Sequence, residues 1–197
     1  MRELLCLAMA RRMGQTITKD TAVEILRDLF PDRSYDPKQF GQQDYKGYTF
    51  RCERLSEILP ELHPLHEAHY AETEKYRRGI PLNMHYEALK DSERAGGLLQ
   101  FTARRTDTGE LVGNMRIFVG RSLHTQTLFT TEDTFYVVPE HRGGFMAVRL
   151  WQFAERAGLS IGIKEARFSS KLVNKADKMA KYLKYEPVAT QFVKFAD

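Results

Sequence analysis

The chain has 197 residues, of which 42% are hydrophobic and 28% are charged, and its formal net charge is +4. This length and composition predict one globular domain and exclude a fibrous repeat or a long disordered tail. The two cysteines, Cys6 and Cys52, are too few for a disulfide framework or a four-thiolate zinc site, so a reducing compartment such as the cytoplasm is expected.

Helical patterns begin the chain. The longest apolar stretch, residues 4–10, is far shorter than the roughly 20 residues that cross a bilayer, so it predicts a helix that ends before Gly14. A second helix is expected to open at Thr18 or Asp20 and to end at Pro31, because Thr and Asp cap helix starts and proline interrupts helices.

A change of pattern follows these two helices. Residues 31–47 have no hydrophobic periodicity and are rich in Asp, Gly, Gln and Tyr, so we expect a loop there. The loop divides the chain into a helical extension, residues 1–47, and a main domain, residues 48–197. A short strand over residues 48–52 begins the main domain.

The next segment is again helical in pattern. Residues 55–78 predict helical turns that Pro60 and Pro64 interrupt. Residues 83–95 predict a further helix, which Gly96 closes.

The pattern then alternates with the period of a strand. Residues 98–105 and 111–120 predict an antiparallel hairpin, because the turn-forming residues 106–109 lie between them. A third strand over residues 133–138 is expected to stop at Pro139. One face of the second strand is expected to hold Leu111, Gly113, Met115, Ile117 and Val119.

The last part of the chain mixes both periods. A helix runs from Ala147 towards Gly158, which is expected to cap it. A strand over residues 164–170, a helix over residues 172–183 and a closing strand over residues 188–195 complete the predicted fold, which is of the α/β class.

The connection between the third strand and the following helix has a composition suited to phosphate binding. It contains Gly143 and Gly144, which let the backbone turn tightly, and it leads directly into a helix start, where amide N–H groups and the helix dipole attract anions. A diphosphate fits such a loop. The alternative is that the glycines only make a tight connection.

The same stretch resembles a known family. Residues 137–147 read Val-Val-Pro-Glu-His-Arg-Gly-Gly-Phe-Met-Ala, which is similar to the acetyl-CoA signature of the GCN5-related N-acetyltransferases (GNAT superfamily). The expected order of strands and helices over residues 48–196 is also that of this family. Within the family, the sequence is closest in character to acetyltransferase-like proteins of bacteriophages.

The resemblance implies a fold, an activity and a cofactor. The fold is a central mixed, mostly antiparallel sheet flanked by helices, here with an N-terminal helical extension. The activity is acyl transfer from acetyl-CoA to an amine, with Val137 and Val138 pairing with the pantetheine arm. The expected diphosphate-binding residues are Arg142, Gly143, Gly144, Phe145, Met146 and Ala147.

The chain departs from the family pattern at two positions. Phe145 stands where the signature has its central glycine. Ala180 stands where the family commonly has the tyrosine that protonates the departing thiolate, and Tyr182 lies two residues further on. Tyr182 is therefore the candidate acid if the helix is shifted or ends early.

Acyl transfer to an amine also needs a base. Family members often carry a carboxylate at the start of the signature strand, where this chain has Glu132 and Asp133. Strand alternation is expected to send the two side chains to opposite faces, so one of them can serve, and we prefer Asp133. His124, in the preceding connection, is an alternative.

Basic residues gather near the C-terminus. Lys171, Lys175, Lys178 and Tyr182 follow helical spacing and form one predicted stripe. The stripe fits a phosphate or nucleic-acid contact, and it equally fits a solvent-exposed helix face, which we favour.

Two other groups of residues suggest no site. His63, His66 and His69 are spaced by three, so their rings fan out around a helix and predict no metal centre. Cys52 could act as a nucleophile only beside a histidine base, for which the sequence gives no sign.

Three functions remain open at this point. The first is an acyl-CoA N-acyltransferase that acts on a small-molecule or protein amine, as a monomer or homodimer. The second is a phage enzyme of the same fold that modifies DNA or RNA. The third is a phage structural or host-binding protein whose signature has decayed, as Phe145 and Ala180 would permit.

Overall fold

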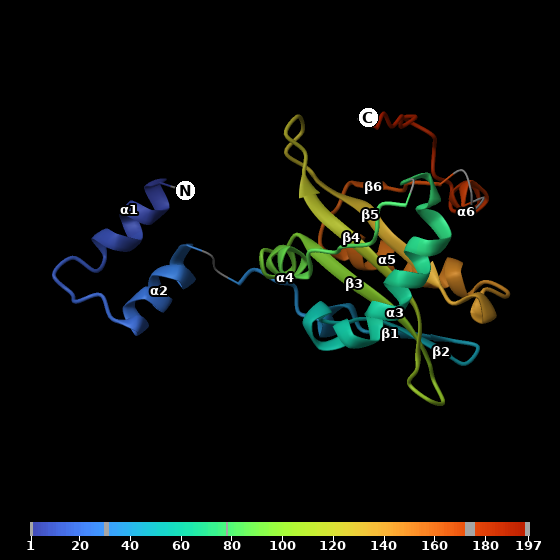
Figure 1. Ribbon diagram of the computed structural model, residues 1–197, viewed down its shortest axis with the longest axis horizontal. Helices are drawn as coiled ribbons and strands as arrows, with labels where there is room; N and C mark the ends of the chain where they lie inside the picture. The colour runs from blue at the N-terminus through green and yellow to red at the C-terminus, as the bar shows by residue number, and fades with distance from the viewer. Residues whose placement is uncertain (1, 30–31, 78, 172–175, 196–197) are drawn as a thin grey trace.

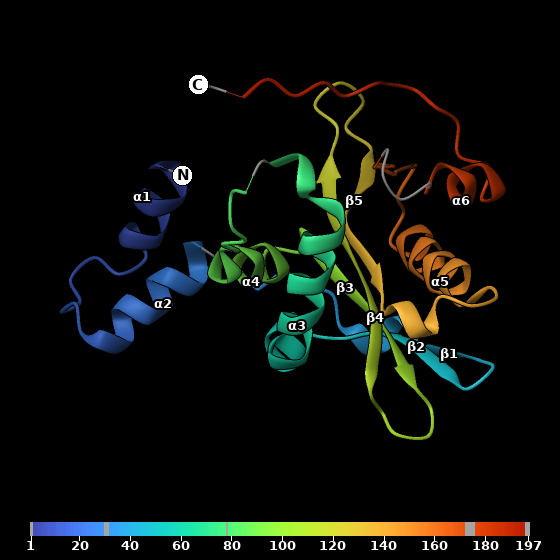
Figure 2. The same ribbon diagram turned by 45° about the vertical axis from the view of Figure 1, so that its right-hand side comes forward.

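The computed structural model describes residues 2–29, 32–77, 79–171 and 176–195. Six strands form one sheet in chain order, with helices on both faces (Figure 1, Figure 2). The strands are β1 (Gln42–Tyr45), β2 (Tyr48–Cys52), β3 (Leu98–Arg105), β4 (Leu111–Arg121), β5 (Leu128–Val137) and β6 (Glu165–Arg167). The helices are α1 (Arg2–Ala10), α2 (Lys19–Leu29), α3 (Leu55–Thr73), α4 (Tyr86–Arg94), α5 (Met146–Ser160) and α6 (Asp177–Tyr182).

The sheet confirms the predicted fold class. Neighbouring strands are antiparallel from β1 to β5, and β6 is parallel to β5. The expected hairpin is β3 and β4. Two predicted strands differ in extent: β5 begins at Leu128 rather than Asp133, and β6 covers Glu165–Arg167 rather than residues 164–170.

Helix α5 covers one face of the sheet. Leu150 and Trp151 of this helix are buried against Phe50 of β2 and Phe101 of β3. Gly158 lies inside α5 and does not cap it, contrary to the prediction. A Cβ at Gly158 would lie 2.6 Å from Ile163 Cδ1, so the glycine lets the chain after the helix pack closely against it.

Helix α3 covers the opposite face and is continuous, so the predicted interruption by proline is wrong. Pro60 and Pro64 lie inside the helix on its exposed side, and the buried side supplies the packing that holds it together. That buried side consists of Leu55, Ile58, Leu62 and Leu65.

A bulge in β4 corrects the expected face of Leu111. Ala103 pairs with Gly113 and Arg104 pairs with Leu111, which leaves Val112 as an extra residue. Leu111 therefore packs in the cluster beneath α3, whereas Val112 packs in the cluster beneath α5.

The expected loop over residues 31–47 contains a strand. Strand β1 pairs with β2 through a tight turn at Lys46 and Gly47, both of which have positive φ angles. A 3₁₀ turn over Pro37–Phe40 precedes it. The sequence of β1 is polar and does not alternate, so its strand pairing comes from its neighbour and the turn.

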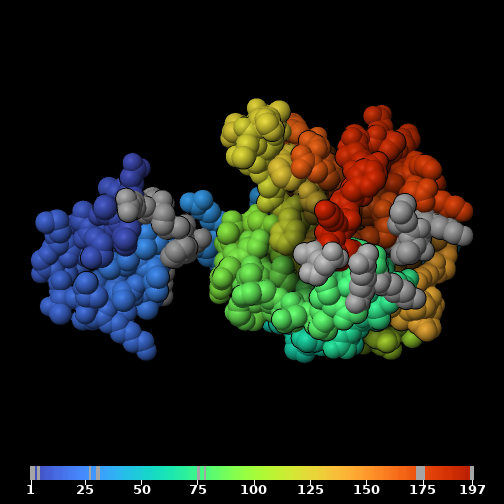
Figure 3. Space-filling view, turned by 45° about the horizontal axis from the view of Figure 1, so that its top comes forward, coloured from blue at the N-terminus to red at the C-terminus, as the bar shows by residue number. Residues whose placement is uncertain are grey.

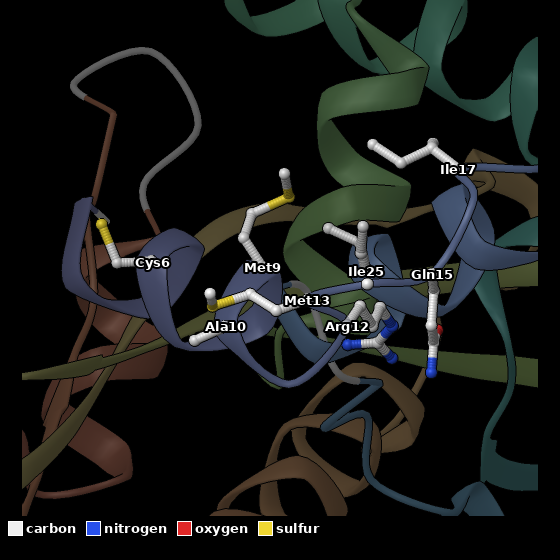
Figure 4. Close-up of a pocket in the computed structure, with 9 residues that line it drawn as sticks. Cys6, Met9, Ala10, Arg12, Met13, Gln15, Ile17 and Ile25 are labelled. Carbon is white, nitrogen blue, oxygen red and sulfur yellow. The ribbon is translucent and has the colours of Figure 1, made fainter.

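The two N-terminal helices are confirmed, and they form a lobe beside the rest of the molecule (Figure 3). The Oγ1 of Thr18 accepts a hydrogen bond from the Thr21 N–H, which caps α2 as expected. A hollow of about 460 Å³ lies between the helices, lined by apolar side chains such as Met9, Met13 and Ile25 (Figure 4). The candidate site residues lie elsewhere.

The C-terminal part differs most from the prediction. Helix α6 spans Asp177–Tyr182, and residues 172–175 of the longer expected helix lie outside the described residues. Residues 188–195 form no strand, and Val188 and Phe192 are 91% and 89% exposed. Alternating apolar residues give a strand only where a neighbouring strand supplies hydrogen bonds, and this segment lies away from the sheet. In the described part of the chain, no helix is long and apolar enough to span a bilayer.

Packing of α3 on the sheet can be tested at Leu62, which is fully buried. We expect Leu62→Ala to lower the free energy of unfolding by about 2–5 kcal/mol, because it leaves a cavity. The exposed Glu67 of the same helix gives the control, since Glu67→Ala should change it by less than about 0.5 kcal/mol. Urea denaturation followed by circular dichroism measures both, and equal effects would contradict this packing.

Candidate active site

Strand β5 has a strand on both sides only over its first part. β6 pairs with residues 129–131, and among the described residues no strand lies beside residues 132–137 on that side. The Val138 N–H donates to the Val112 carbonyl of β4 at 2.9 Å. By alternation along the strand, the Val137 N–H points away from β4, so it is placed to pair with an extended ligand.

The two candidate bases lie at a bulge in β5. Thr134 lies opposite Arg116 and Glu132 lies opposite Ile117, which leaves Asp133 as the extra residue. A bulge interrupts alternation, so the expected placement of the two carboxylates by alternation alone does not apply here. Their contacts place them instead.

Asp133 is held by a buried arginine. The Arg116 Nε and Nη2 both contact Asp133 Oδ2, at 2.7 and 2.6 Å, and the Thr134 hydroxyl donates to the same oxygen at 3.1 Å. Arg116 is almost fully buried. Because a buried guanidinium needs a paired anion, this carboxylate is committed to the ion pair.

Glu132 lies in a different environment. Its side chain is half-buried, and the Ser169 N–H, just beyond β6, donates to its Oε2 at 3.4 Å. Burial raises the pKa of the Glu132 carboxyl to about 7, and the negative charge of Asp133 acts in the same direction. A carboxyl that titrates near neutral pH is suited to general base catalysis.

The end of α3 is tied to the segment after β6. Lys171 Nζ contacts Glu74 Oε1 at 2.9 Å and donates to the Tyr76 hydroxyl at 3.3 Å. Burial alone would raise the pKa of Glu74, but the hydrogen bonds from Lys171 and Arg77 outweigh it and bring this pKa to about 2. Lys171 thus forms an ion pair with Glu74 near Glu132, and the positive charge of Lys171 acts to lower the pKa of the Glu132 carboxyl.

The predicted lysine stripe is only partly described. Lys171 is paired as above, Lys175 lies outside the described residues, and Lys178 is exposed on α6. The stripe as a whole therefore stays a prediction.

The glycine-rich connection leaves space at its backbone. A 3₁₀ turn over Pro139–His141 follows β5, and α5 begins at Met146. A Cβ built on Gly143 or Gly144 would meet nothing within 4 Å outside the adjacent residues, and Gly144 has a φ of +66°. The backbone at these glycines is open to a ligand.

Arg142 anchors this connection to α3. Its Nη1 and Nη2 donate to the two carboxylate oxygens of Glu72 at 2.9 and 2.6 Å, and its Nε donates to the Val137 carbonyl at 2.8 Å. Its guanidinium also lies 5.2 Å from the ring centre of Tyr136. The Arg142 side chain therefore fixes the loop, and its backbone N–H already donates to the Pro139 carbonyl at 3.2 Å, so the predicted diphosphate contact falls to the residues after it.

The remaining residues of the signature divide into exposed and buried. Phe145 immediately precedes α5 and is 49% exposed, and its ring contacts that of Tyr182, with the ring centres 5.8 Å apart. Met146 is buried in the core and Ala147 is half-buried against it. Met146 and Ala147 can therefore contribute only backbone groups to ligand binding.

The other candidates lie apart from this constellation or are inert. His66 contacts the ring of Tyr86, and burial lowers the pKa of His66 to about 3, which keeps it neutral. Burial raises the pKa of the Cys52 thiol to about 12, so it is a poor nucleophile. His124 is exposed in the β4–β5 turn. No group of His, Cys, Asp and Glu in the described ranges could hold a metal ion.

Sequence reasoning missed three charged residues of the site: Arg116, Glu72 and Glu74. A signal existed for Arg116, because an arginine inside an apolar strand must find a carboxylate. Glu72 and Glu74 carry no such signal, since they lie at a polar helix end and meet partners far along the chain.

Comparison with known proteins yields structural neighbours. AAC(6′)-Iy in complex with the bisubstrate analogue CoA-S-monomethyl-acetylneamine has a TM-score of 0.61 and 16% identity, covering 77% of this chain and 99% of that one. An aminoglycoside acetyltransferase from an uncultured soil metagenomic sample, in complex with sisomicin, has a TM-score of 0.58 and 12% identity, covering 77% and 95%. The ribosomal-protein-alanine N-acetyltransferase from Brucella melitensis biovar Abortus 2308 has a TM-score of 0.57 and 16% identity, covering 76% and 99%. No protein-family model and no curated protein matches the sequence.

The chain has the GNAT acyltransferase fold. The expectation from the signature is thus confirmed for the fold. The closer likeness to bacteriophage proteins stays a prediction.

The ion pair of Asp133 with Arg116 can be measured by a double-mutant cycle. We expect Asp133→Asn to lower the free energy of unfolding by about 2–4 kcal/mol, because it leaves a buried cation without its anion. In a protein that already carries Arg116→Met, the same Asp133→Asn change should have a much smaller effect. The exposed pair of Asp107 with Arg105 is the control, where Asp107→Asn should have little effect on the free energy of unfolding, because water screens exposed ion pairs. Additive effects of Asp133→Asn and Arg116→Met would contradict the coupling.

Proposed function

We propose that this protein transfers an acyl group, foremost acetyl, from coenzyme A to an amine. One arrangement carries the proposal: β5 brings together a carboxyl that titrates near pH 7, an unpaired backbone edge and an open glycine connection. These are a base for the amine, a strand edge for an extended cofactor arm and an anion site. The GNAT fold of the chain supports the same reaction.

The residues present fit coenzyme A. The open backbone at Gly143 and Gly144 and the start of the 15-residue helix α5 suit a diphosphate, because N–H groups and the helix dipole are directed there. The Val137 N–H would pair with the pantetheine arm, whereas the Val138 N–H is already bonded to β4. When bound, acetyl-CoA would supply the activated thioester carbonyl.

Glu132 is the base in this proposal. At neutral pH a large part of its carboxyl is ionised and can accept a proton from the ammonium of the acceptor. Asp133 has a positioning role, because its ion pair with Arg116 fixes the bulge next to Glu132. Asp133, the carboxylate preferred from sequence, would thus act through Glu132.

The acceptor in this proposal is an amine of a small molecule or a protein. One neighbour holds sisomicin and another is named for the alanine of a ribosomal protein, and both names imply amines as acceptors. A nucleic-acid acceptor is less well supported, because the contacts of Lys171 with Glu74 and Tyr76 remove one lysine of the stripe. Action in the cytoplasm remains part of the proposal.

The role of Glu132 gives a pH-dependent prediction. Since the base must be ionised and its pKa is about 7, kcat/KM should rise with pH through about 7. Glu132→Gln should lower turnover by about 10²- to 10⁴-fold with unchanged affinity for acetyl-CoA. Steady-state kinetics and calorimetry measure these, and Glu140→Gln, in the exposed turn after β5, is the control. Wild-type turnover in Glu132→Gln would transfer the role to Asp133 or His124.

The glycine connection gives a binding prediction. Gly143→Val adds its Cβ in open space, at a backbone without a positive φ, so the fold should be kept, but the added side chain would occupy the proposed position of the diphosphate. We expect acetyl-CoA binding, measured by calorimetry, to be lost, while Glu140→Val, in the same connection, keeps it. Equal affinities in Gly143→Val and wild type would place the cofactor elsewhere.

A further inference from the structure

Two exposed aromatic rings meet beside the glycine connection. Phe145 comes from the residue before α5 and Tyr182 from the end of α6, and they are 49% and 59% exposed. Their ring centres are 5.8 Å apart and their planes are inclined by 42°. Single exposed aromatic residues are common, but these two come from separate elements and form one apolar surface next to a candidate anion site.

The surface around the two rings is basic. The segment from Asp177 to Lys184, which contains α6, has three exposed lysines, Lys178, Lys181 and Lys184, and one acid, Asp177. Asp177 is paired with Lys181 at 3.0 Å. Lys178 precedes Tyr182 by four residues, so the two lie on the same side of α6. An aromatic surface flanked by an ammonium group matches a ligand that joins a flat ring to a phosphate.

Phe145 leaves the glycine backbone accessible. A Cβ built on Gly143 has no atom of Phe145 within 4 Å, so the bulky residue does not cover the open backbone at this glycine. The side chain instead lies against Tyr182. The departure from glycine at position 145 therefore adds a ring beside the anion site.

We propose that Phe145 and Tyr182 form the stacking surface for the adenine ring of coenzyme A, with Lys178 placed for the ribose 3′-phosphate. This inference rests on the proposed acyl transfer, since it assigns the nucleotide end of the same cofactor. The adenine and the thiol lie at opposite ends of coenzyme A. Tyr182 is therefore a nucleotide-binding residue, and its hydroxyl is not the acid that protonates the thiolate.

Three ligands separate the parts of the cofactor: coenzyme A, 4′-phosphopantetheine, which lacks the nucleotide, and adenosine 3′,5′-bisphosphate, which lacks the arm. Loss of stacking on one ring should lower affinity by about 5- to 100-fold. In calorimetry, Phe145→Leu and Tyr182→Leu should show this loss for coenzyme A and the bisphosphate, and none for 4′-phosphopantetheine. Tyr182→Phe should bind as the wild type does, because it keeps the ring.

The experiment can separate failure of the stacking surface from failure of the proposed acyl transfer. Phe192→Leu removes an exposed ring outside the pair and should change nothing. Lys178→Gln should weaken coenzyme A but not dephospho-coenzyme A. Unchanged coenzyme A affinity in both leucine variants would overturn the stacking surface and leave acyl transfer standing. Binding of the bisphosphate that depends on both rings, in a protein without acyl transfer to any amine, would support the surface and overturn the proposed function.

Discussion

Strand β6 stays beside β5 for three residues and then leaves it, and the candidate site depends on this departure. After Arg167 the chain turns Phe168 into the core, where its ring meets Trp151 edge-on with the centres 4.5 Å apart. Tyr185 accepts a hydrogen bond from the Trp151 Nε1 at 2.9 Å and so covers the same ring. Beyond Thr131, β5 keeps β4 as a partner but has no described strand on the side of β6. Glu132, whose carboxyl has a pKa of about 7, is the first residue of β5 without a strand on that side.

Buried cations hold the opposite side of the site. Arg104 of β3 contacts Glu53 at 2.8 Å and Glu61 of α3 at 2.6 Å, and Arg116 of β4 contacts Asp133 of β5. Because both guanidinium groups are almost fully buried, removing one of these carboxylates would leave a poorly solvated charge that has lost a partner, so these contacts help to fix which residues lie opposite each other. Helix α3 is thus held against the sheet by the packing of its apolar side chains and by the ion pair of Glu61 with Arg104. Asp133, the extra residue of the β5 bulge, is the partner of Arg116 in this set.

Local patterns predicted most elements, and long-range contacts account for the errors. β2, β3 and α5 carry clear periodicity, and the signature located the glycine connection before α5. Strand β1 has no apolar alternation, so the sequence pattern missed it. Residues 188–195 alternate but meet no neighbouring strand, so the pattern predicted a strand that the structure does not have there. In the site, the contact of Arg142 with Glu72 joins residues 70 positions apart, which no local pattern encodes. The positions of Glu132 and Asp133 depended on a bulge set by the neighbouring strand.

One of the two departures from the family signature, Phe145, contacts Tyr182, the candidate acid named from the sequence. Phe145, before α5, stands where the family signature has a glycine, and Ala180, on α6, stands where the family commonly has a tyrosine, two residues before Tyr182. Here the new ring at 145 contacts the ring at 182, whereas the backbone at Gly143 stays open. The ring of Phe145 thus lies against Tyr182 and outside the open space at Gly143, so this departure from the signature is compatible with the proposed cofactor site.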